Sequence, residues 1–237
     1  MNPQTKTPIN HPVVTREQWN ATLADFLVKE KAHTRAGDAL ARERMALPWV
    51  LVDKDYLFEG PNGTVSLSDL FDGRSQLIVY HFMYDPTWDA GCSGCTFLSD
   101  HIDATLPHLN NHDVSLVAVS RAPLSTLEAY KKRMGWHFPW FSSGQGDFNY
   151  DFCASYHREE LDAGPVYHNF KTQKLNCEDQ PGTSVFYKTP EGEIFHTYSS
   201  YERGGEPLIT TYNYLDIAPL GRNEESGMDW MKRHDEY

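Results

Sequence analysis

The sequence predicts an α/β domain preceded by a helical arm. Two nearly continuous apolar segments rich in β-forming residues, 76–84 and 113–120, predict buried strands. The segment between them has helical periodicity, which makes a βαβ unit. Two later strand-like segments are joined by a short turn and predict an antiparallel pair. Both parallel and antiparallel strand pairs are therefore expected.

The composition is that of a globular protein. Of 237 residues, 40% are hydrophobic and 23% are charged, so a sizeable core can form. The formal net charge of −12 argues against nucleic acid and anionic membranes as main partners. No apolar run approaches the ~20 residues that span a bilayer, and residues 1–12 lack the apolar region of a secretory signal. We therefore expect a soluble, cytoplasmic protein whose four cysteines rest mainly as thiols.

Residues 1–48 are expected to form a helical arm. Residues 15–18 have the pattern of a capping box. Apolar residues follow it at helical spacing, namely Trp19, Leu23, Phe26 and Leu27. Gly37 is expected to weaken or divide the helix, and Pro48 to end it.

Residues 49–220 are expected to form one domain, because they contain no repeat, low-complexity tract or long linker. Strand-like runs at 49–52 and 56–58, followed by the turn-forming residues 60–63, suggest a β-hairpin. The crossover helix of the βαβ unit is expected over 95–106. The remaining expected elements are a helix over 124–134 ending at Gly135, a short strand over 138–141, an antiparallel pair over 184–188 and 193–198, and helical structure over 207–215.

The motif Cys92-Ser93-Gly94-Cys95 follows the first buried strand and begins the crossover helix. Two sulfurs three residues apart in a first helical turn can close a disulfide. The free backbone N–H groups and the positive helix end stabilise a thiolate on the more exposed cysteine. Cys92 is therefore the predicted nucleophile and Cys95 the resolving thiol. Gly91 and Gly94 are expected to let the backbone of a substrate approach closely.

Two other interpretations of the motif are a structural half-zinc site and a pair of inert thiols. Cys92 and Cys95 are followed by His108 and His112 at the spacing of a zinc finger. A continuous helix over 95–106 would hold His108 about 20 Å from Cys95, at ~1.5 Å rise per residue. We therefore expect no bound metal, and the thiol chemistry requires no organic cofactor.

Several blocks of the sequence carry a family resemblance. They are residues 82–88 with 91–95, 116–123, 132–136, 138–140, 147–152 and 184–188, and in the tail 228–230 and 233–237. The run from Asp72 to Pro219 resembles the thioredoxin-like superfamily, and specifically a bacterial family of thioredoxin-like proteins filed as a domain of unknown function. The resemblance implies a three-layer sandwich, with a central mixed sheet and helices on both faces. The hairpin before Leu67 and the block 120–156 look closer to the peroxiredoxin branch than to thioredoxin itself.

The resemblance also implies roles for individual residues. Thioredoxins place a cis-proline opposite the Cys-x-x-Cys, and here that position is Gly182 or Thr183, which we expect to contact substrate. His81 lies about where thioredoxins keep a buried acid that relays a proton to the resolving cysteine, so it is a candidate general base, or else a core imidazole. Peroxiredoxins carry a threonine three residues before the reactive cysteine, where this chain has Asp89. A peroxidase is therefore the weaker interpretation.

Four further residues are interpreted from their positions. Trp88 either shields the disulfide and contacts a partner or packs in the core. Arg121 follows a strand end, where it is expected to pair with a carboxylate rather than steer an anion. Cys153 and Cys177 lie in loop contexts and are expected to be bystanders.

The leading functional hypothesis is a thiol–disulfide oxidoreductase. Its substrate would be a disulfide or an oxidised thiol, and its electrons would come from a dithiol donor. The alternatives are a thiol peroxidase of peroxiredoxin type and a non-catalytic binding or redox-sensing module that uses an aromatic surface around Trp136, Trp140 and Tyr150. The tail, residues 221–237, is expected to pack on the domain or, with the arm, on a second copy in a homodimer.

Overall fold

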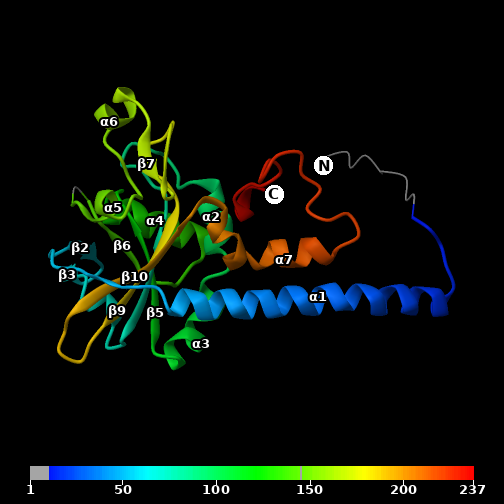
Figure 1. Cartoon of the computed structure of the whole chain (residues 1–237). Helices are drawn as coiled ribbons and strands as arrows, with labels where there is room; N and C mark the ends of the chain where they lie inside the picture. Colours follow the sequence, from blue (N-terminus) through cyan, green and yellow to red (C-terminus); the bar gives the residue numbers. More distant parts are fainter. Residues whose placement is uncertain (1–10, 145) are drawn as a thin grey trace. The chain divides into compact units, whose positions relative to one another are not determined.

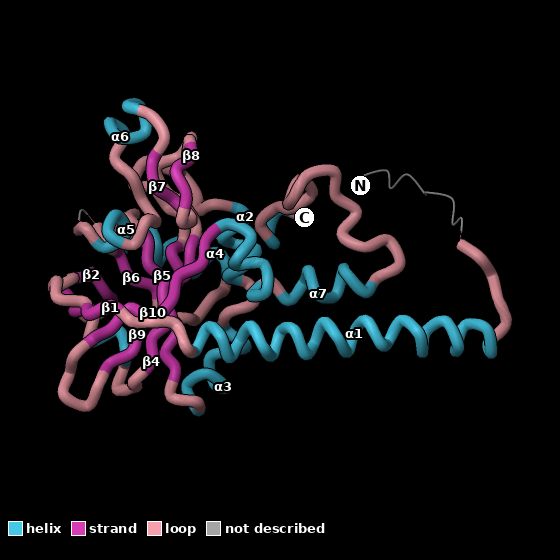
Figure 2. Tube along the Cα trace, viewed as in Figure 1, coloured by secondary structure: helices cyan, strands magenta, loops and turns pink. Residues whose placement is uncertain are grey.

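The computed structural model describes residues 11–144 and 146–237 (Figures 1 and 2). The chain divides into two compact units, residues 1–47 and 48–237. The first contains helix α1 and the second contains the sheet with its covering helices. Among the described residues, none of the helices combines the length and hydropathy that a bilayer span requires.

Helix α1 (Arg16–Met45) is continuous over 30 residues. The expected capping box is confirmed: Gln18 N donates to Thr15 Oγ1 over 3.3 Å, and Thr15 N donates to Gln18 Oε1 over 3.0 Å. Gly37 does not divide the helix, so the expected division is wrong. A single glycine costs a helix only about 1 kcal/mol relative to alanine, which a helix of this length tolerates. No α1 side chain is buried.

The second unit is built on a mixed sheet of eight strands in the order β1-β10-β9-β4-β5-β6-β2-β3. The central strands are β4 (Gln76–His81), β5 (Val114–Ser120), β6 (Trp140–Ser142), β9 (Gly182–Lys188) and β10 (Ile194–Tyr201). β4, β5 and β6 run parallel, whereas β9 is antiparallel to both β4 and β10. This arrangement confirms the mixed sheet, the βαβ unit and the late antiparallel pair.

The hairpin at the sheet edge differs from the expected one. The strands that pair are β2 (Leu57–Gly60) and β3 (Gly63–Ser66), joined by the turn at 60–63. β1 (Val50–Leu51) does not pair with β2 but with β10, more than 140 residues later. Between β1 and β2, Lys54 forms ion pairs with Asp147 and Asp151, both at 2.7 Å. Local sequence carries no information on such a distant strand partner.

The crossover between β4 and β5 is broken into three short helices. They are α2 (Ser93–Ser99), the 3-10 turn η2 (Asp103–Thr105) and α3 (Leu106–Asn111). The single helix expected over 95–106 is therefore wrong. Pro107 lies in the first turn of α3, where it needs no N–H partner, but its ring would clash with the fourth carbonyl before it in a continuous helix. The expected distance of about 20 Å between Cys95 and His108 assumed that this helix is continuous. The described residues nevertheless bring together no three His, Cys, Asp or Glu side chains able to hold a metal ion.

Helix α4 (Leu124–Met134) ends as predicted at Gly135, which has φ 70°. The chain then forms several elements that the sequence pattern did not indicate. These are α5 (Phe148–Asp151), α6 (Arg158–Ala163) and a separate two-stranded ribbon of β7 (Val166–His168) and β8 (Lys171–Gln173). Helical structure returns as expected in η3 (Glu202–Leu208) and α7 (Thr210–Ile217).

The two faces of the sheet bury separate hydrophobic clusters. Side chains of α2, α4 and α7 pack on one face with Tyr80 and Phe82. The 3-10 turn η1 (Asp69–Phe71) and α5 pack on the other face with Leu77 and Val79. Successive side chains of a strand point to opposite faces, which is why neighbouring β4 residues divide between the clusters. The sandwich with helices on both faces is confirmed, and α2, α4 and α7 can be followed in Figure 1.

The tail packs on the first of these clusters. Met228, Trp230 and Met231 are partly buried against it, and the Trp230 ring lies 5.6 Å from the Phe97 ring of α2. A last 3-10 turn, η4 (His234–Glu236), is tied to α4 through Arg133, which donates to Asp235 over 2.7 Å. Residues 221–237 thus belong to the folded unit that contains the sheet.

Candidate active site

The two cysteines of the motif lie at the start of α2, directly after the loop that leaves β4. Cys92 is the residue before the helix and is half-buried, whereas Cys95 lies inside the first turn and is 1% exposed. The loop is fixed to the helix at Met83: Cys92 N donates to the Met83 carbonyl over 3.1 Å, and Met83 N donates to Cys95 Sγ over 3.4 Å. One sulfur is therefore accessible and the other sealed.

The surroundings move the pKa values of the two thiols in opposite directions. The Cys95 thiol donates a hydrogen bond to Cys92, which lowers the pKa of Cys92 to about 6 against the opposing effect of burial. The backbone N–H groups of Gly94 and Cys95 and the charge of Arg233 add to this lowering. Burial raises the pKa of Cys95, and its bond to Cys92 raises it further. At neutral pH the site holds a thiolate next to a neutral thiol.

The lowered pKa of Cys92 predicts how the rate of its alkylation depends on pH. Modification of Cys92 by iodoacetamide should follow its thiolate, with a midpoint near pH 6 and a rate at pH 5 about one tenth of the plateau. Cys95→Ala removes the hydrogen-bond donor and should move the midpoint upward, whereas Cys95→Ser keeps a donor and should move it less. Mass spectrometry of the labelled peptide checks the site. A midpoint near 8 to 9 in the unaltered protein would contradict this assignment.

Tyr80, and not His81, is the β4 residue next to the resolving thiol. The Tyr80 hydroxyl hydrogen-bonds to Cys95, and both residues belong to the same buried cluster. His81 points to the opposite face, where Nε2 lies 2.9 Å from Ser184 Oγ and the ring stacks 5.5 Å from Phe148. Burial lowers the pKa of His81 to about 4, so the ring is neutral. Of the two interpretations of His81, these contacts favour the core imidazole and not the general base.

The two glycines of the motif have different surroundings. A side chain at Gly91 would meet the Phe82 ring at 2.6 Å, and its carbonyl accepts a hydrogen bond of 2.7 Å from Arg233 Nη2. A side chain at Gly94 would meet Met228 of the tail at 3.5 Å. The Phe82 ring thus occupies the space at Gly91, whereas Gly94 lines the cavity beside the thiols, so a close approach of substrate at Gly94 stays a prediction. Trp88 is partly buried against the same cluster.

A cavity of about 500 Å³ opens beside Cys92 and Cys95. Gly182 and Thr183 line it from the start of β9, next to Pro181, so the structure brings together both thiols and the segment expected to contact substrate. The other walls come from Tyr80, Leu98, Ile209 and Tyr212, from the η3 turn, and from the tail at Arg222, Glu224, Gly227 and Met228. The tail's contribution was not predicted, because nothing in the sequence placed residues 222–228 near the thiols.

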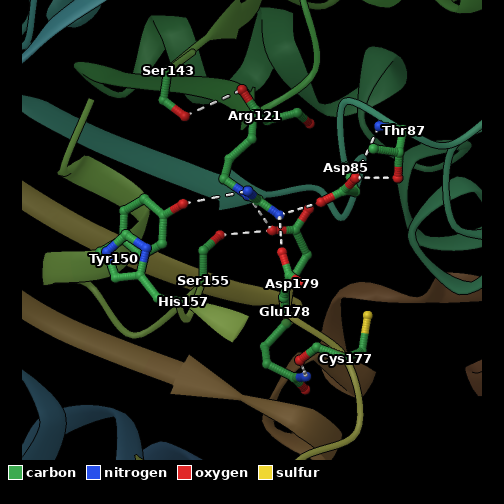
Figure 3. A network of polar contacts seen from close by, with 12 residues as sticks. Asp85, Thr87, Arg121, Ser143, Tyr150, Ser155, His157, Cys177, Glu178 and Asp179 are labelled. Atoms are coloured by element: carbon green, nitrogen blue, oxygen red, sulfur yellow. Dashed lines mark hydrogen bonds and ion pairs between the residues drawn. The ribbon is translucent and has the colours of Figure 1, made fainter. Parts of the chain in front are cut away.

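Arg121 joins two loops that flank the site, and Figure 3 shows its contacts with Asp85 and Asp179. It is 8% exposed and pairs with Asp85, which lies in the loop before Cys92. It also donates to Asp179 over 2.6 Å, in the loop before Gly182. Glu178 lies 3.6 Å away, and Tyr150 accepts a bond of 3.3 Å. The expected pairing with a carboxylate is confirmed.

The charges of this cluster are tightly coupled. Burial would lower the pKa of Arg121, but Asp179 and Asp85 outweigh it and raise the pKa, so the guanidinium stays charged. Burial would raise the pKa of Asp85, yet the bonds from Thr87 and the charge of Arg121 hold it below its usual value. Burial dominates at Asp179 and raises its pKa. The cluster is thus a buried ion network that fixes both loops.

The remaining thiols differ from Cys92 in their electrostatics. Burial raises the pKa of both Cys153 and Cys177. The aromatic surface suggested for a binding module is also corrected: Trp136 is 7% exposed and Trp140 1% exposed, so both are core residues. Tyr150 is half-buried and stacks on His157 at 4.2 Å.

One family of sequences matches nearly the whole chain. It is described as bacterial protein of unknown function, DUF899, and the match covers residues 8–237. The chain belongs to this family. The resemblance noted from the sequence blocks is thereby confirmed. A search of curated proteins finds no match to this DUF899 protein.

Solved structures with a similar fold include two bacterial peroxiredoxins and a thiol:disulfide interchange protein. Peroxiredoxin Q of Xanthomonas campestris, in a cysteine-to-serine mutant, has a TM-score of 0.44 at 16% identity, covering 67% of this chain and 90% of the other. Peroxidoxin BcpB of Mycobacterium tuberculosis has a TM-score of 0.44 at 14% identity, covering 71% of this chain and 97% of the other. The Bacteroides sp. thiol:disulfide interchange protein has a TM-score of 0.41 at 16% identity, covering 76% of this chain and 97% of the other. What the DUF899 thiols can do follows from their own geometry.

Proposed function

We propose that this DUF899 protein is a thiol–disulfide oxidoreductase in which Cys92 is the nucleophile and Cys95 the resolving thiol. The observation that carries the proposal is the placement of the two sulfurs: half-buried Cys92 directly precedes α2, Cys95 lies in its first turn and is 1% exposed, and both line one cavity. The pKa of Cys92 is lowered to about 6, which makes it a thiolate at neutral pH, and that of the buried Cys95 is raised. Such a pair attacks with the accessible sulfur and keeps the other protonated until it is needed.

The reaction balances without a metal or organic cofactor. The Cys92 thiolate attacks one sulfur of the substrate disulfide, the substrate S–S bond breaks, and the released thiolate takes up a proton. Cys95 then loses its proton and attacks Cys92 Sγ, which releases the second substrate thiol and leaves the Cys92–Cys95 disulfide. A dithiol donor reduces this disulfide and completes the cycle.

The two alternative functions have less support. A thiol peroxidase would use the same thiolate, but the position three residues before Cys92 is the exposed Asp89 and supplies no hydroxyl for a peroxide. A binding module would need the aromatic surface around Trp136 and Trp140, and those rings are buried. Disulfide exchange requires only the two thiols and the cavity beside them.

A redox titration tests the proposal. Equilibration in dithiothreitol buffers, followed by alkylation and mass spectrometry, should give one two-electron transition that links Cys92 to Cys95. Because a stabilised thiolate favours the reduced form, its potential should lie between about −270 and −120 mV. The Cys153→Ser, Cys177→Ser double variant should titrate identically. The absence of a Cys92–Cys95 disulfide under oxidising conditions would refute the proposed function.

A further inference from the structure

The cavity beside the thiols has the size and chemistry of a small-molecule site. Its volume of about 500 Å³ lies within the range of pockets that enclose ligands of a few hundred daltons. Its wall is largely apolar and includes the side chains of Tyr80, Leu98, Ile209, Tyr212 and Met228. Cys92 and Cys95 lie in the same wall, so a molecule that fills the cavity meets the sulfur that attacks.

The charged groups of the cavity are already paired within the chain. Glu206 binds Arg203 over 2.7 Å and Arg222 over 3.1 Å. Glu202 accepts from Asn169 over 2.9 Å, and Glu224 accepts from the Trp230 indole over 3.1 Å.

The lining carries a net negative charge, which affects the charge that a ligand can have. Three glutamates, residues 202, 206 and 224, stand against two arginines, residues 203 and 222, which leaves an excess of one negative charge. Both arginines of the lining are engaged in ion pairs with carboxylates of this chain, so an anionic ligand would compete with those pairs.

The tail restricts access by extended chains. Residues 222–228 form part of the cavity wall, and Met228 approaches Gly94 in the first turn of α2. The contacts of Arg233 with the Gly91 carbonyl and with the Tyr130 hydroxyl, at 2.7 and 3.0 Å, hold this segment in place. A disulfide in a protein would have to bring its flanking backbone past this tail segment to reach Cys92, whereas a small disulfide enters the cavity whole.

We infer that the cavity binds an uncharged, mainly apolar low-molecular-weight disulfide and that this class of molecule is the substrate of Cys92. The inference rests on the proposed function and adds the substrate class. The S–S bond of the ligand lies against Cys92 Sγ, its organic groups occupy the apolar wall, and reduction yields two small thiols while the protein dithiol becomes a disulfide.

Substrates matched in size test the charge preference. With dithiothreitol as donor, bis(hydroxyethyl) disulfide is uncharged, dithiodipropionate is a dianion of similar size, and insulin represents protein disulfides. We expect the kcat/KM for the uncharged compound to exceed that for the dianion by about tenfold, as a negative lining disfavours anions. Insulin should be reduced no faster than by dithiothreitol alone.

Filling the cavity tests its location. A side chain at Gly205 would lie 3.7 Å from Leu98 Cδ1, an ordinary contact, so Gly205→Leu projects into the cavity without a clash at its first carbon. It should raise the KM for bis(hydroxyethyl) disulfide about tenfold, as expected for lost space in an apolar pocket. The alkylation midpoint of Cys92 should stay near pH 6. Gly227→Leu provides a second cavity-filling variant, and Gly37→Leu, in α1, is the matched control.

The outcomes separate the two proposals. Efficient reduction of insulin and of dithiodipropionate would overturn the substrate class and leave the oxidoreductase in place. Unchanged kinetics of both cavity-filling variants would overturn the assignment of the cavity. A failure of the protein to reduce any disulfide, in the presence of a normal Cys92 thiolate, would overturn the proposed function and the inference with it.

Discussion

Cys92→Ser is expected to abolish disulfide reduction, down to the rate of the dithiol donor alone. A serine hydroxyl cannot form a mixed disulfide, and the resolving thiol cannot replace it because Cys95 is 1% exposed and its pKa is raised. Cys95→Ser should instead retain the attack and stop at the mixed disulfide. Intact-mass spectrometry should show the substrate fragment attached to Cys92. Steady-state reduction of bis(hydroxyethyl) disulfide measures the loss.

The other two cysteines supply the controls for this experiment. Cys153→Ser and Cys177→Ser make the same chemical change at thiols whose pKa values are raised by burial. Both variants should keep at least about half of the activity, since neither thiol is a thiolate at neutral pH. Activity retained by Cys92→Ser, or lost on Cys177→Ser, would assign the nucleophile elsewhere.

Arg121→Met is expected to destabilise the fold by about 3–5 kcal/mol. The substitution keeps the volume of the side chain but leaves Asp85 and Asp179, which are 8% and 2% exposed, without their cation. For a unit of this size the loss corresponds to a decrease in Tm of roughly 6–20 °C. Urea unfolding monitored by tryptophan fluorescence gives the free energy of unfolding.

Arg158→Met is the matched control for that variant. Arg158 binds Glu178, at the edge of the same cluster, over 2.9 Å, but half of its side chain is exposed. Exposed ion pairs contribute at most about 1 kcal/mol, so the free energy of unfolding of this variant should be close to that of the unaltered protein. Equal losses for the two arginines would mean that the buried network does not stabilise the loops around the thiols.

The elements of the fold that could be predicted are those encoded locally. The apolar runs that became β4 and β5, the helix that ends at Gly135, and the pair β9–β10 were all indicated by period and turn residues. The errors concern long-range choices. β1 pairs with a strand more than 140 residues later, and Pro107 divides a helix whose apolar spacing continues through it.

The site was predictable in its chemistry and less so in its surroundings. The spacing of Cys92 and Cys95 identified the dithiol, and the resemblance placed Gly182 and Thr183 beside it, where the cavity lies. The general-base interpretation of His81 fails because neighbouring β4 side chains point to opposite faces of the sheet: Tyr80 reaches Cys95 and His81 does not. The neighbouring carboxylates Asp85 and Asp179 gave no signal in sequence, since Arg121 unites them only in the folded chain.

The anchoring of the last residues onto α2 bears on how the protein can be divided experimentally. A fragment that stops at residue 220 would contain the whole sheet and both thiols, and by sequence pattern it would pass for an intact unit. It would lack the guanidinium of Arg233 that binds the Gly91 carbonyl and the thioether of Met228 that lies against Gly94. Excision at that boundary would therefore yield a dithiol with altered acidity and an open flank, and its reactivity would misrepresent that of the full chain.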